Sequence, residues 1–355
     1  MYRFLFLLCI IWFVSTVSAG SFTDSLAQKQ HVKRPGAVKP LTLDSLASKA
    51  NEYCQDYSHK LSLFLYGKYK YNKFSIYHKE HKANLLYTPN GNFNTGFGFN
   101  YKWLGIGLAF NLGAINNDDE KYGETSRLDL QTNIYLKKMV VDFYFQYYKG
   151  FYINNPQDVF IPEDLQDHIY KRPDISTVSL GLSAMYVFNH EKFSYRSAFK
   201  QTSIQKKSAG SFLLGGTAFL QGVQADSSIF PSQSYFEVLP KVKQHSAIYF
   251  GVESAYAHNF VIKKHFFVSL SLMLSMQFGF TNTTIEDLSV NTNVVPVLHL
   301  QPRFAIGVNK PKWYAGFSFV QDNFAQFFDD KKQDWNYSFS SGHFRVFIGK
   351  RVNWF

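Results

Sequence analysis

Eight ionisable residues share the polar side of sequence segments that alternate between apolar and polar positions. They are Asp129, Asp142, Arg196, Lys200, Glu253, Arg303, Arg345 and Arg351. If these segments are strands around an enclosed interior, all eight side chains face inward. Two roles for these eight residues then agree with the sequence. The first is a selectivity lining whose excess of cations favours anionic solutes. The second is a network of ion pairs that fills a closed interior, because unpaired buried charge is costly.

The histidines and serines give little support for catalysis or metal binding. His343 follows Ser340 and Ser341, and His299 shares a face with Arg303, but neither spacing demands a catalytic arrangement. His78 and His81 are plausibly spaced for a metal, yet no cysteine or acidic cluster completes a ligand set. The sequence therefore predicts no catalytic residue, no metal site and no cofactor, and an enzyme that modifies acyl groups stays a minor alternative.

The last segment, from His343 to Phe355, indicates what kind of strand positions these residues. Apolar side chains at Phe344, Val346 and Ile348 alternate with polar or small ones. Alternation over this length, with aromatics near the boundary, is typical of a strand that crosses a bilayer. We interpret the segment as the closing strand of a membrane barrel, and the final strand of a soluble sheet is the alternative. The residues that mark this segment as a closing strand are Gly349, Val352, Trp354 and Phe355.

Neighbouring segments keep apolar residues opposite apolar ones when they are folded back as hairpins. Folding residues 128–136 against residues 139–147 about Lys137 and Lys138 pairs Ile134 with Val141 on the apolar face. The same register pairs Asn133 with Asp142 and Asp129 with Gln146 on the other face. A slip by one residue would turn these carboxylates into lipid.

Three further hairpins follow the same rule. Residues 178–188 are predicted to return through 189–192, which places Tyr186 beside Tyr195 and Leu182 beside Phe199. Residues 298–308 are predicted to return through 309–312, with Val308 opposite Trp313. The fourth hairpin pairs residues 248–260 with 266–280, and another turn or bulge is predicted near Leu104 and Gly105.

The longest uncharged run, residues 266–285, is long enough for a transmembrane helix. Its polar members exclude that reading, because Ser269, Ser271, Ser275 and Gln277 share one parity while the leucines between them share the other. We therefore expect a strand here and no membrane-spanning helix after the N-terminal segment.

The N-terminus predicts export. Tyr2 and Arg3 precede an apolar run that ends in small residues, which indicates a signal peptide over residues 1–19. Residues 20–58 are predicted to form a periplasmic segment, and residues 59–355 a barrel. Once the signal is removed, Cys54 is the single cysteine, so no internal disulfide is expected.

Short turns alternate with long polar stretches along the rest of the chain, as the two sides of an outer-membrane barrel require. The fold class that follows is all-β: an antiparallel up-and-down transmembrane barrel of about 12 to 14 strands, with 14 as the best count. Residues 202–245 are predicted as one long outside loop that constricts or covers the barrel, and an additional strand pair is the alternative.

The net charge of +11 fits lipid phosphates or another polyanion. We find no nucleic-acid motif, and the lysines lie in turns rather than along one stripe, so no nucleic-acid partner is predicted. The expected partners are outer-membrane lipid, the machinery that inserts barrels and other envelope proteins.

Several strings together resemble a known family. They are Tyr87 to Asn90, Gly96 to Gly107, Val141 to Tyr144 leading to Tyr148 to Tyr152, and Phe193 to Arg196 followed by Gln205 to Ser211. This combination is similar to an uncharacterised family of Gram-negative exported proteins, described as a domain of unknown function and thought to be outer-membrane β-barrels. The resemblance covers most of the chain after the signal peptide and implies no functional residue.

Together these observations predict a Gram-negative outer-membrane barrel that acts as a transport channel or as a structural envelope component. The alternative is a membrane anchor of a secretion or surface complex, and an enzyme acting on lipid comes third.

Overall fold

A computed structural model describes residues 52–91, 93–111, 118–160, 169–286, 288–327 and 334–353. The predicted signal peptide, most of the predicted periplasmic segment, Trp354 and Phe355 lie outside these residues. Among the described residues, no helix is both long and apolar enough to cross a membrane.

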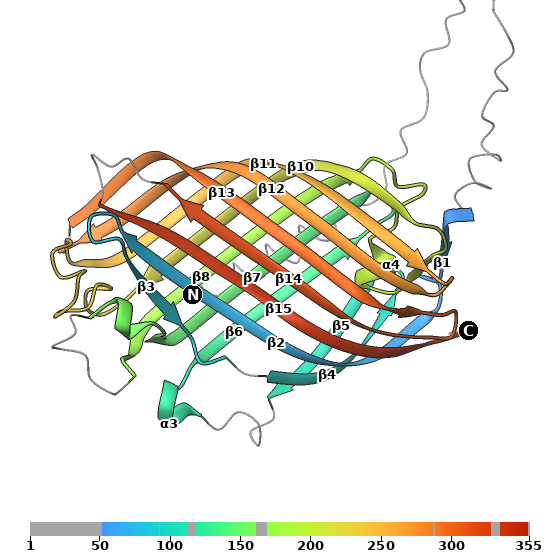
Figure 1. The fold of residues 1–355 in the computed structure, drawn as a ribbon, viewed down its shortest axis with the longest axis horizontal. Helices are drawn as coiled ribbons and strands as arrows, with labels where there is room; N and C mark the ends of the chain where they lie inside the picture. The colour runs from blue at the N-terminus through green and yellow to red at the C-terminus, as the bar shows by residue number, and fades with distance from the viewer. Residues whose placement is uncertain are drawn as a thin grey trace, which may run out of the picture. The chain divides into compact units, whose positions relative to one another are not determined.

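The barrel wall is an antiparallel sheet of 13 strands, within the predicted range of 12 to 14 (Figure 1). Its strands are β2 (Leu61–His78), β3 (Ala83–Thr88), β4 (Phe93–Tyr101), β5 (Leu104–Asn111), β6 (Ser126–Tyr135), β7 (Met139–Ile153), β8 (Lys171–Val187), β10 (Ala209–Gln224), β11 (Val242–Ile262), β12 (Phe266–Ile285), β13 (Leu288–Asn309), β14 (Trp313–Gln326) and β15 (Trp335–Val352). The remaining elements are the strand pair β1 (Cys54–Asp56) and β9 (Ser203–Gln205), and the short helices α3 (Asp119–Tyr122), η1 (Pro156–Asp158) and α4 (Arg196–Phe199).

The last strand closes the barrel, as its sequence predicts. β15 pairs with β2 along its whole length, from Trp335 opposite His78 to Val352 opposite Leu61. The ring contains ten strands, namely β2, β3, β7, β8 and β10 to β15. Gly349 is needed in β15 because a Cβ atom there would run into the ring of Tyr314.

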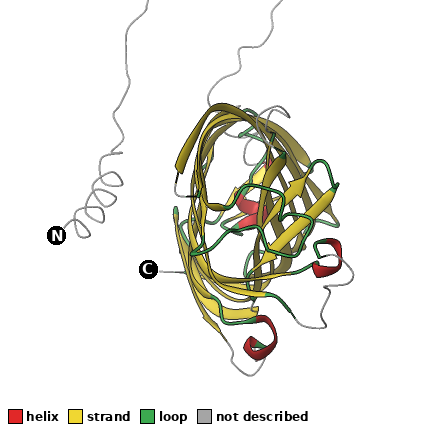
Figure 2. Ribbon diagram, turned by 90° about the vertical axis from the view of Figure 1, so that its left-hand side faces the viewer, coloured by secondary structure: helices red, strands yellow, loops and turns green. Residues whose placement is uncertain are grey.

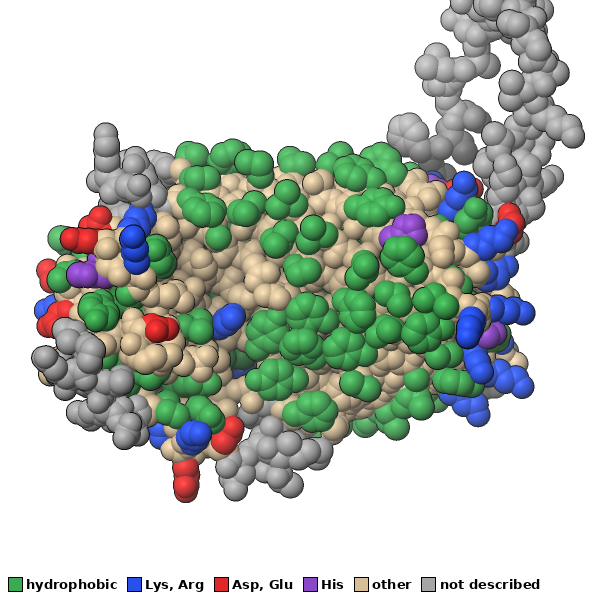
Figure 3. Space-filling model, viewed as in Figure 1, with side chains coloured by type: hydrophobic (Ala, Val, Ile, Leu, Met, Phe, Trp, Pro, Cys, Tyr) green, Lys and Arg blue, Asp and Glu red, His purple; other side chains and the backbone are tan. Residues whose placement is uncertain are grey.

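The faces of the strands follow the predicted parity. On β12, Leu270, Leu272 and Phe278 are exposed outward, whereas Ser269 and Gln277 are buried inside. The outward apolar side chains cover the middle of the barrel in Figure 3. This surface is the one that a bilayer-spanning barrel presents to lipid, so the alternation in the sequence reflects lipid outside and a polar interior.

The hairpin β6–β7 has the predicted register, with Ile134 opposite Val141 and Asn133 opposite Asp142. β11 and β12 also form the predicted hairpin, although both strands run beyond the predicted ends. The hairpin β13–β14 is wrong by two residues, because Val308 lies opposite Ala315 instead of Trp313. A shift of two residues keeps every side chain on its predicted face, so the apolar pattern alone could not exclude it.

The predicted partner of residues 178–188 is wrong. β8 pairs with β10, with Leu182 opposite Ala218, while residues 193–199 leave the wall and include α4. β10 is rich in glycine, which has low strand propensity, and this composition concealed the strand. The prediction that residues 202–245 form a single outside loop is corrected by the same strand, because β10 also pairs with β11. The alternative of additional strand structure in this segment was nearer to the observed fold.

One part of the wall departs from a simple up-and-down order. β3 and β7 are joined only by Tyr87 opposite Ile153 and Thr88 opposite Tyr152. Beyond this joint, β4 continues beside β2 and pairs with β5, while β6 pairs with β7. Among the described residues, no ladder joins β5 to β6. We call this unpaired boundary between residues 104–111 and 126–135 the seam.

The two ends of the barrel differ. The connections at residues 102–103, 136–138, 263–265 and 310–312 are short and lie at one end, which we call the turn end. The longer connection from β8 to β10, residues 188–208, also starts and finishes at this end. The opposite end carries the connections after β2, β7, β10, β12 and β14, of which those after β2 and β12 are also short, and we call it the loop end. Figure 2 shows loops crossing the inside of the ring.

Candidate functional site

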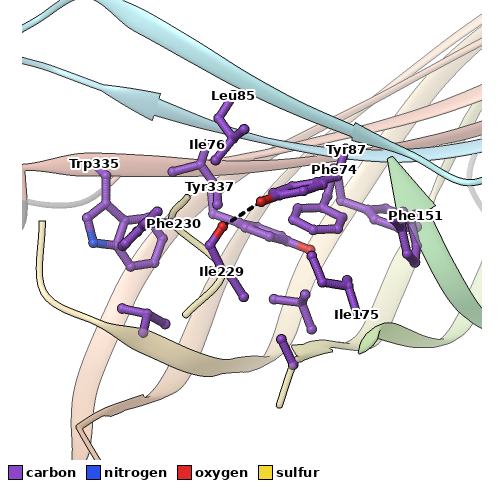
Figure 4. Packing of buried hydrophobic residues seen from close by; sticks show 14 of the residues in the cluster. Phe74, Ile76, Leu85, Tyr87, Phe151, Ile175, Ile229, Phe230, Trp335 and Tyr337 are labelled. Atoms are coloured by element: carbon purple, nitrogen blue, oxygen red, sulfur yellow. Dashed lines mark hydrogen bonds between the residues drawn. The ribbon is translucent and has the colours of Figure 1, made fainter. Parts of the chain in front are cut away.

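An apolar cluster fills the interior toward the loop end. It combines wall residues such as Phe74 and Trp335 with residues of the β10–β11 connection, including Ile229 and Phe230. Figure 4 shows how these side chains converge, with the Tyr87 hydroxyl donating a hydrogen bond to the Ile229 carbonyl oxygen at 2.7 Å. This bond ties the inward-folded connection to the wall.

A second apolar cluster fills the interior toward the turn end. Phe193, Tyr195 and Phe199, from the segment that leaves the wall, pack with Tyr135 and Met273. Aromatic side chains at alternating positions made residues 193–199 resemble a strand. In the structure the same side chains occupy the lumen and bury their rings there.

Polar contacts anchor this inserted segment, residues 193–205. Asn309 donates from Nδ2 to the carbonyl oxygens of Ser197 at 2.9 Å and Ser203 at 3.0 Å. Arg351 donates from Nε to the carbonyl oxygen of Gln201 at 2.9 Å and from Nη2 to Asn309 Oδ1 at 2.6 Å. Arg351 therefore caps backbone groups and does not line an open passage.

Two of the predicted inward residues meet across the interior. Arg303 on β13 forms an ion pair with Asp142 on β7, and its Nη1 donates to the Tyr135 hydroxyl at 3.0 Å. Arg303 and Asp142 have exposed fractions of only 2% and 6%. Asn133 donates a second hydrogen bond to Asp142 at 2.5 Å. These bonds span the lumen between the two apolar clusters.

His299, which the sequence places on the same face as Arg303, lies beside Glu253. His299 Nε2 is 3.1 Å from Asp322 Oδ1, and its Nδ1 is 3.9 Å from Glu253 Oε1. The imidazole stacks on Phe324 with a centroid distance of 4.0 Å. Ser183 donates its hydroxyl hydrogen to Glu253 and not to His299, so this serine is not prepared as a nucleophile. The group is a buried structural network.

Arg196 lies apart from the other predicted residues. It belongs to α4 and its Nη2 is 3.4 Å from Asp56 Oδ2 on β1. Cys54 lies on the same strand β1, opposite Gln205 of β9, and its burial raises the pKa of the thiol to about 11. These residues belong to the turn end and not to the wall.

A polar cavity of about 450 Å³ lies behind the seam. Five of its lining residues are basic, namely Lys68, Lys70, Arg127, Lys200 and Arg345, and Asp129 is the single acidic one. β2, β5, β6 and β15 supply most of the lining, and Lys200 reaches it from the inserted segment. The structure thus brings three predicted residues together, Asp129, Lys200 and Arg345, with three lysines and arginines that sequence reasoning missed.

The single carboxylate is already engaged. Asp129 Oδ1 is 2.8 Å from Lys70 Nζ, and the Tyr148 hydroxyl donates to Asp129 Oδ2 at 2.7 Å. Arg345 instead lies between aromatic rings, 4.9 Å from the ring centroid of Phe64 and 5.1 Å from that of Tyr66. Its Nε is buried and has no hydrogen-bond partner in the described part of the chain. Burial beside Arg345 lowers the pKa of Lys200 to about 8.

The missed residues had a detectable signal. Lys68 and Lys70 share parity with Phe64 and Tyr66 on β2, so a full parity assignment of this strand would have turned them inward. Arg127 has the parity of Asp129 on β6. No sequence pattern predicts the seam, because larger apolar residues alternate with small or polar ones in β5 and β6 as they do in paired strands.

The remaining histidines do not form a site. The rings of His78 and His81 are 4.7 Å apart, but no cluster of three or more histidine, cysteine or acidic residues suitable for a metal occurs among the described residues. His343 lines the cavity behind the seam.

Basic side chains gather at the turn end (Figure 3). The short connections there expose Lys102, Lys137, Lys138, Lys263, Lys264, Lys310 and Lys312. These lysines concentrate positive charge at the turn end of the barrel.

Known structures include barrels that align over most of this chain at very low identity. The outer membrane protease OmpT from Escherichia coli is 6% identical, covers 82% of this chain and 97% of its own, and has a TM-score of 0.37. The translocator domain of the autotransporter NalP from Neisseria meningitidis is 7% identical, with coverages of 82% and 88% and a TM-score of 0.32. The Pseudomonas putida toluene transporter TodX is 7% identical, with coverages of 83% and 90% and a TM-score of 0.22.

No curated protein matches the sequence significantly. Residues 43–351 match the family model described as "Domain of unknown function (DUF4421)". This match spans most of the sequence and confirms the predicted resemblance: the chain belongs to the DUF4421 family.

Proposed function

We propose that this protein is a closed outer-membrane barrel that serves as a structural component of the Gram-negative envelope and not as an open channel. The observation that supports it is the filling of the lumen. Apolar clusters occupy the interior toward both ends, and the Arg303–Asp142 pair crosses the space between them. Of the two chemistries open from the sequence, this arrangement favours the ion-pair network over a selectivity lining.

Export to the outer membrane is part of the same proposal. Exposed apolar side chains on strands all around the wall form an apolar belt. This belt and the predicted N-terminal signal support insertion by the envelope's barrel-inserting machinery.

Planar-bilayer recording tests the closed state. Purified protein that shows a heat-dependent electrophoretic shift is expected to give no discrete conductance steps. Phe236 belongs to the same apolar cluster as Phe230. The Phe230→Ala/Phe236→Ala variant keeps the same wall, and its recordings are also expected to be silent, because the inserted segment still blocks the turn end. Regular conductance steps from the wild-type protein would contradict the proposal and support a transport channel.

A second candidate function is a membrane anchor for an envelope assembly. The supporting observation is the concentration of exposed lysines at the turn end, which suits an acidic partner surface. The test compares the size of the mildly extracted complex for wild-type protein and for a variant with Lys137, Lys138, Lys263 and Lys264 changed to Glu. An anchor loses its assembly in this variant, whereas unchanged size argues against the role.

A further inference from the structure

We propose that the cavity behind the seam binds the phosphate group of an anionic phospholipid, which enters from the bilayer between β5 and β6. This inference goes beyond a closed structural barrel, since it assigns a ligand to the wall itself.

The first argument is charge. Lys70 is neutralised by Asp129, but Lys68, Arg127, Lys200 and Arg345 have no ion-pair partner in the described part of the chain. Several cations held together inside a wall that faces lipid are costly unless anions compensate them. A phosphate accepts hydrogen bonds from lysine and arginine at once, and Arg345 offers a planar donor group that suits it. The cavity is therefore complementary to an anion that the chain does not itself supply.

The second argument is access. The residues that line the cavity include Ile106 on β5 and Leu130 on β6. Both side chains point outward, with exposed fractions of 43% and 55%. The cavity consequently reaches the outer surface of the wall between two strands that no ladder joins in the described ranges. Gly105 and Gly107 on β5 add little bulk at the inner side of this passage.

The third argument concerns the rest of the ligand. An apolar groove of about 990 Å³ runs over the outer surface of β2, β4 and β13 to β15. Its floor contains Gly67, Gly96, Gly307 and Gly316, and Phe110 of β5 borders it next to Phe97, at a ring distance of 6.1 Å. A ligand with an anionic head in the cavity can thus lay an acyl chain along the wall. A free anion would gain nothing from this groove, so the proposed ligand is a lipid.

Lipid binding can be measured by native mass spectrometry of the full protein released from dodecyl maltoside micelles. The probes are dioleoyl phosphatidylglycerol, the zwitterionic dioleoyl phosphatidylcholine and inorganic phosphate. The wild-type protein is expected to bind phosphatidylglycerol in preference to both other probes. The Lys68→Gln/Arg345→Gln variant should bind it at least about tenfold more weakly, since it loses two charge-assisted contacts.

A matched control removes the same charge elsewhere. Lys82→Gln/Lys241→Gln changes two exposed lysines of loop-end connections and is expected to bind phosphatidylglycerol like the wild type. If the cavity double variant does not fold, as judged by the heat-dependent shift, Ala109→Trp serves instead. Ala109 lines the cavity on β5, and an indole there should fill the passage and weaken binding to a similar degree.

Three outcomes overturn the inference. Equal affinity of wild type and both cavity variants would place the lipid elsewhere on the belt. Equal affinity for phosphatidylcholine would remove the role of the uncompensated cations. Inorganic phosphate that binds as tightly as phosphatidylglycerol, with the same loss in Lys68→Gln/Arg345→Gln, would identify a site for soluble anions and exclude entry from the bilayer.

Discussion

Arg303 and Asp142 form an ion pair across the lumen, although β8, β10, β11 and β12 lie between their strands along the wall. The contact therefore links opposite sides of the barrel directly. Tyr135 and Asn133 complete its hydrogen bonds, so neither charge is left with a single partner.

Removing one partner of this pair should be much worse than removing both. Arg303→Met leaves Asp142 buried without its cation, and we expect a loss of about 3 to 5 kcal/mol in the free energy of unfolding. The double variant Arg303→Met/Asp142→Leu should recover most of that loss. Urea unfolding of all four forms of the double-mutant cycle measures the coupling, and additive effects would contradict a direct pair.

The inserted segment should detach when its anchors are removed. Asn309→Ala leaves the carbonyl oxygens of Ser197 and Ser203 without their donor, a cost of about 1 to 3 kcal/mol for each orphaned buried group. We expect faster tryptic cleavage after Arg196 and Lys200 in folded protein. Asn323→Ala, which removes a hydrogen bond within the wall to Leu300, is the control and should leave these sites protected.

The thiol of Cys54 should react slowly in the folded protein. Burial raises its pKa from 9.0 to about 11, so the reactive thiolate is about 100-fold less populated at neutral pH than in the unfolded chain. Because the folded pKa is the higher one, the stabilisation linked to the protonated thiol is lost as the pH rises through 9 to 11. Labelling with a chromogenic disulfide should accelerate in urea. An exposed thiol, introduced as Lys264→Cys with Cys54→Ser, should label rapidly in both states.

Lipid affinity at the seam should fall as the pH rises. The pKa of Lys200 is lowered to about 8 by burial and by the neighbouring Arg345, so its ammonium is lost near that pH and the cavity then carries less positive charge. We expect phosphatidylglycerol to bind a few-fold more weakly at about pH 9 than at about pH 7. Lys200→Arg keeps its charge throughout and should flatten this dependence. An equally steep profile in that variant would assign the effect to another group.

The sequence was sufficient for the inward and outward faces of most wall strands and for part of the site. Strict alternation fixed the faces of β6, β7, β12 and β15, because lipid outside and polar groups inside leave one parity for each strand. It could not fix the register of β13 and β14, since a shift by two residues satisfies the same pattern. The sequence pattern did not predict β10, because its glycines lower its strand propensity. It predicted a strand at residues 193–199, because their aromatic side chains alternate.

The candidate site was only partly visible for a different reason. Alternation turns Asp129 and Arg345 inward, but it does not say which inward residues meet. The Arg303–Asp142 pair depends on distances across the lumen, and the cavity depends on β5 and β6 failing to pair. Both are properties of the closed ring and not of any single strand.

The pairing of β2 with β15 sets the order of events in assembly. The first long strand of the barrel finds its partner in the last one, so its free edge stays open until the whole chain has been delivered. Contacts this distant in sequence form slowly, and open strand edges invite aggregation. A chain interrupted before Trp335 lacks the partner for this edge of β2, so the pairing of β15 is the step that closes the ring.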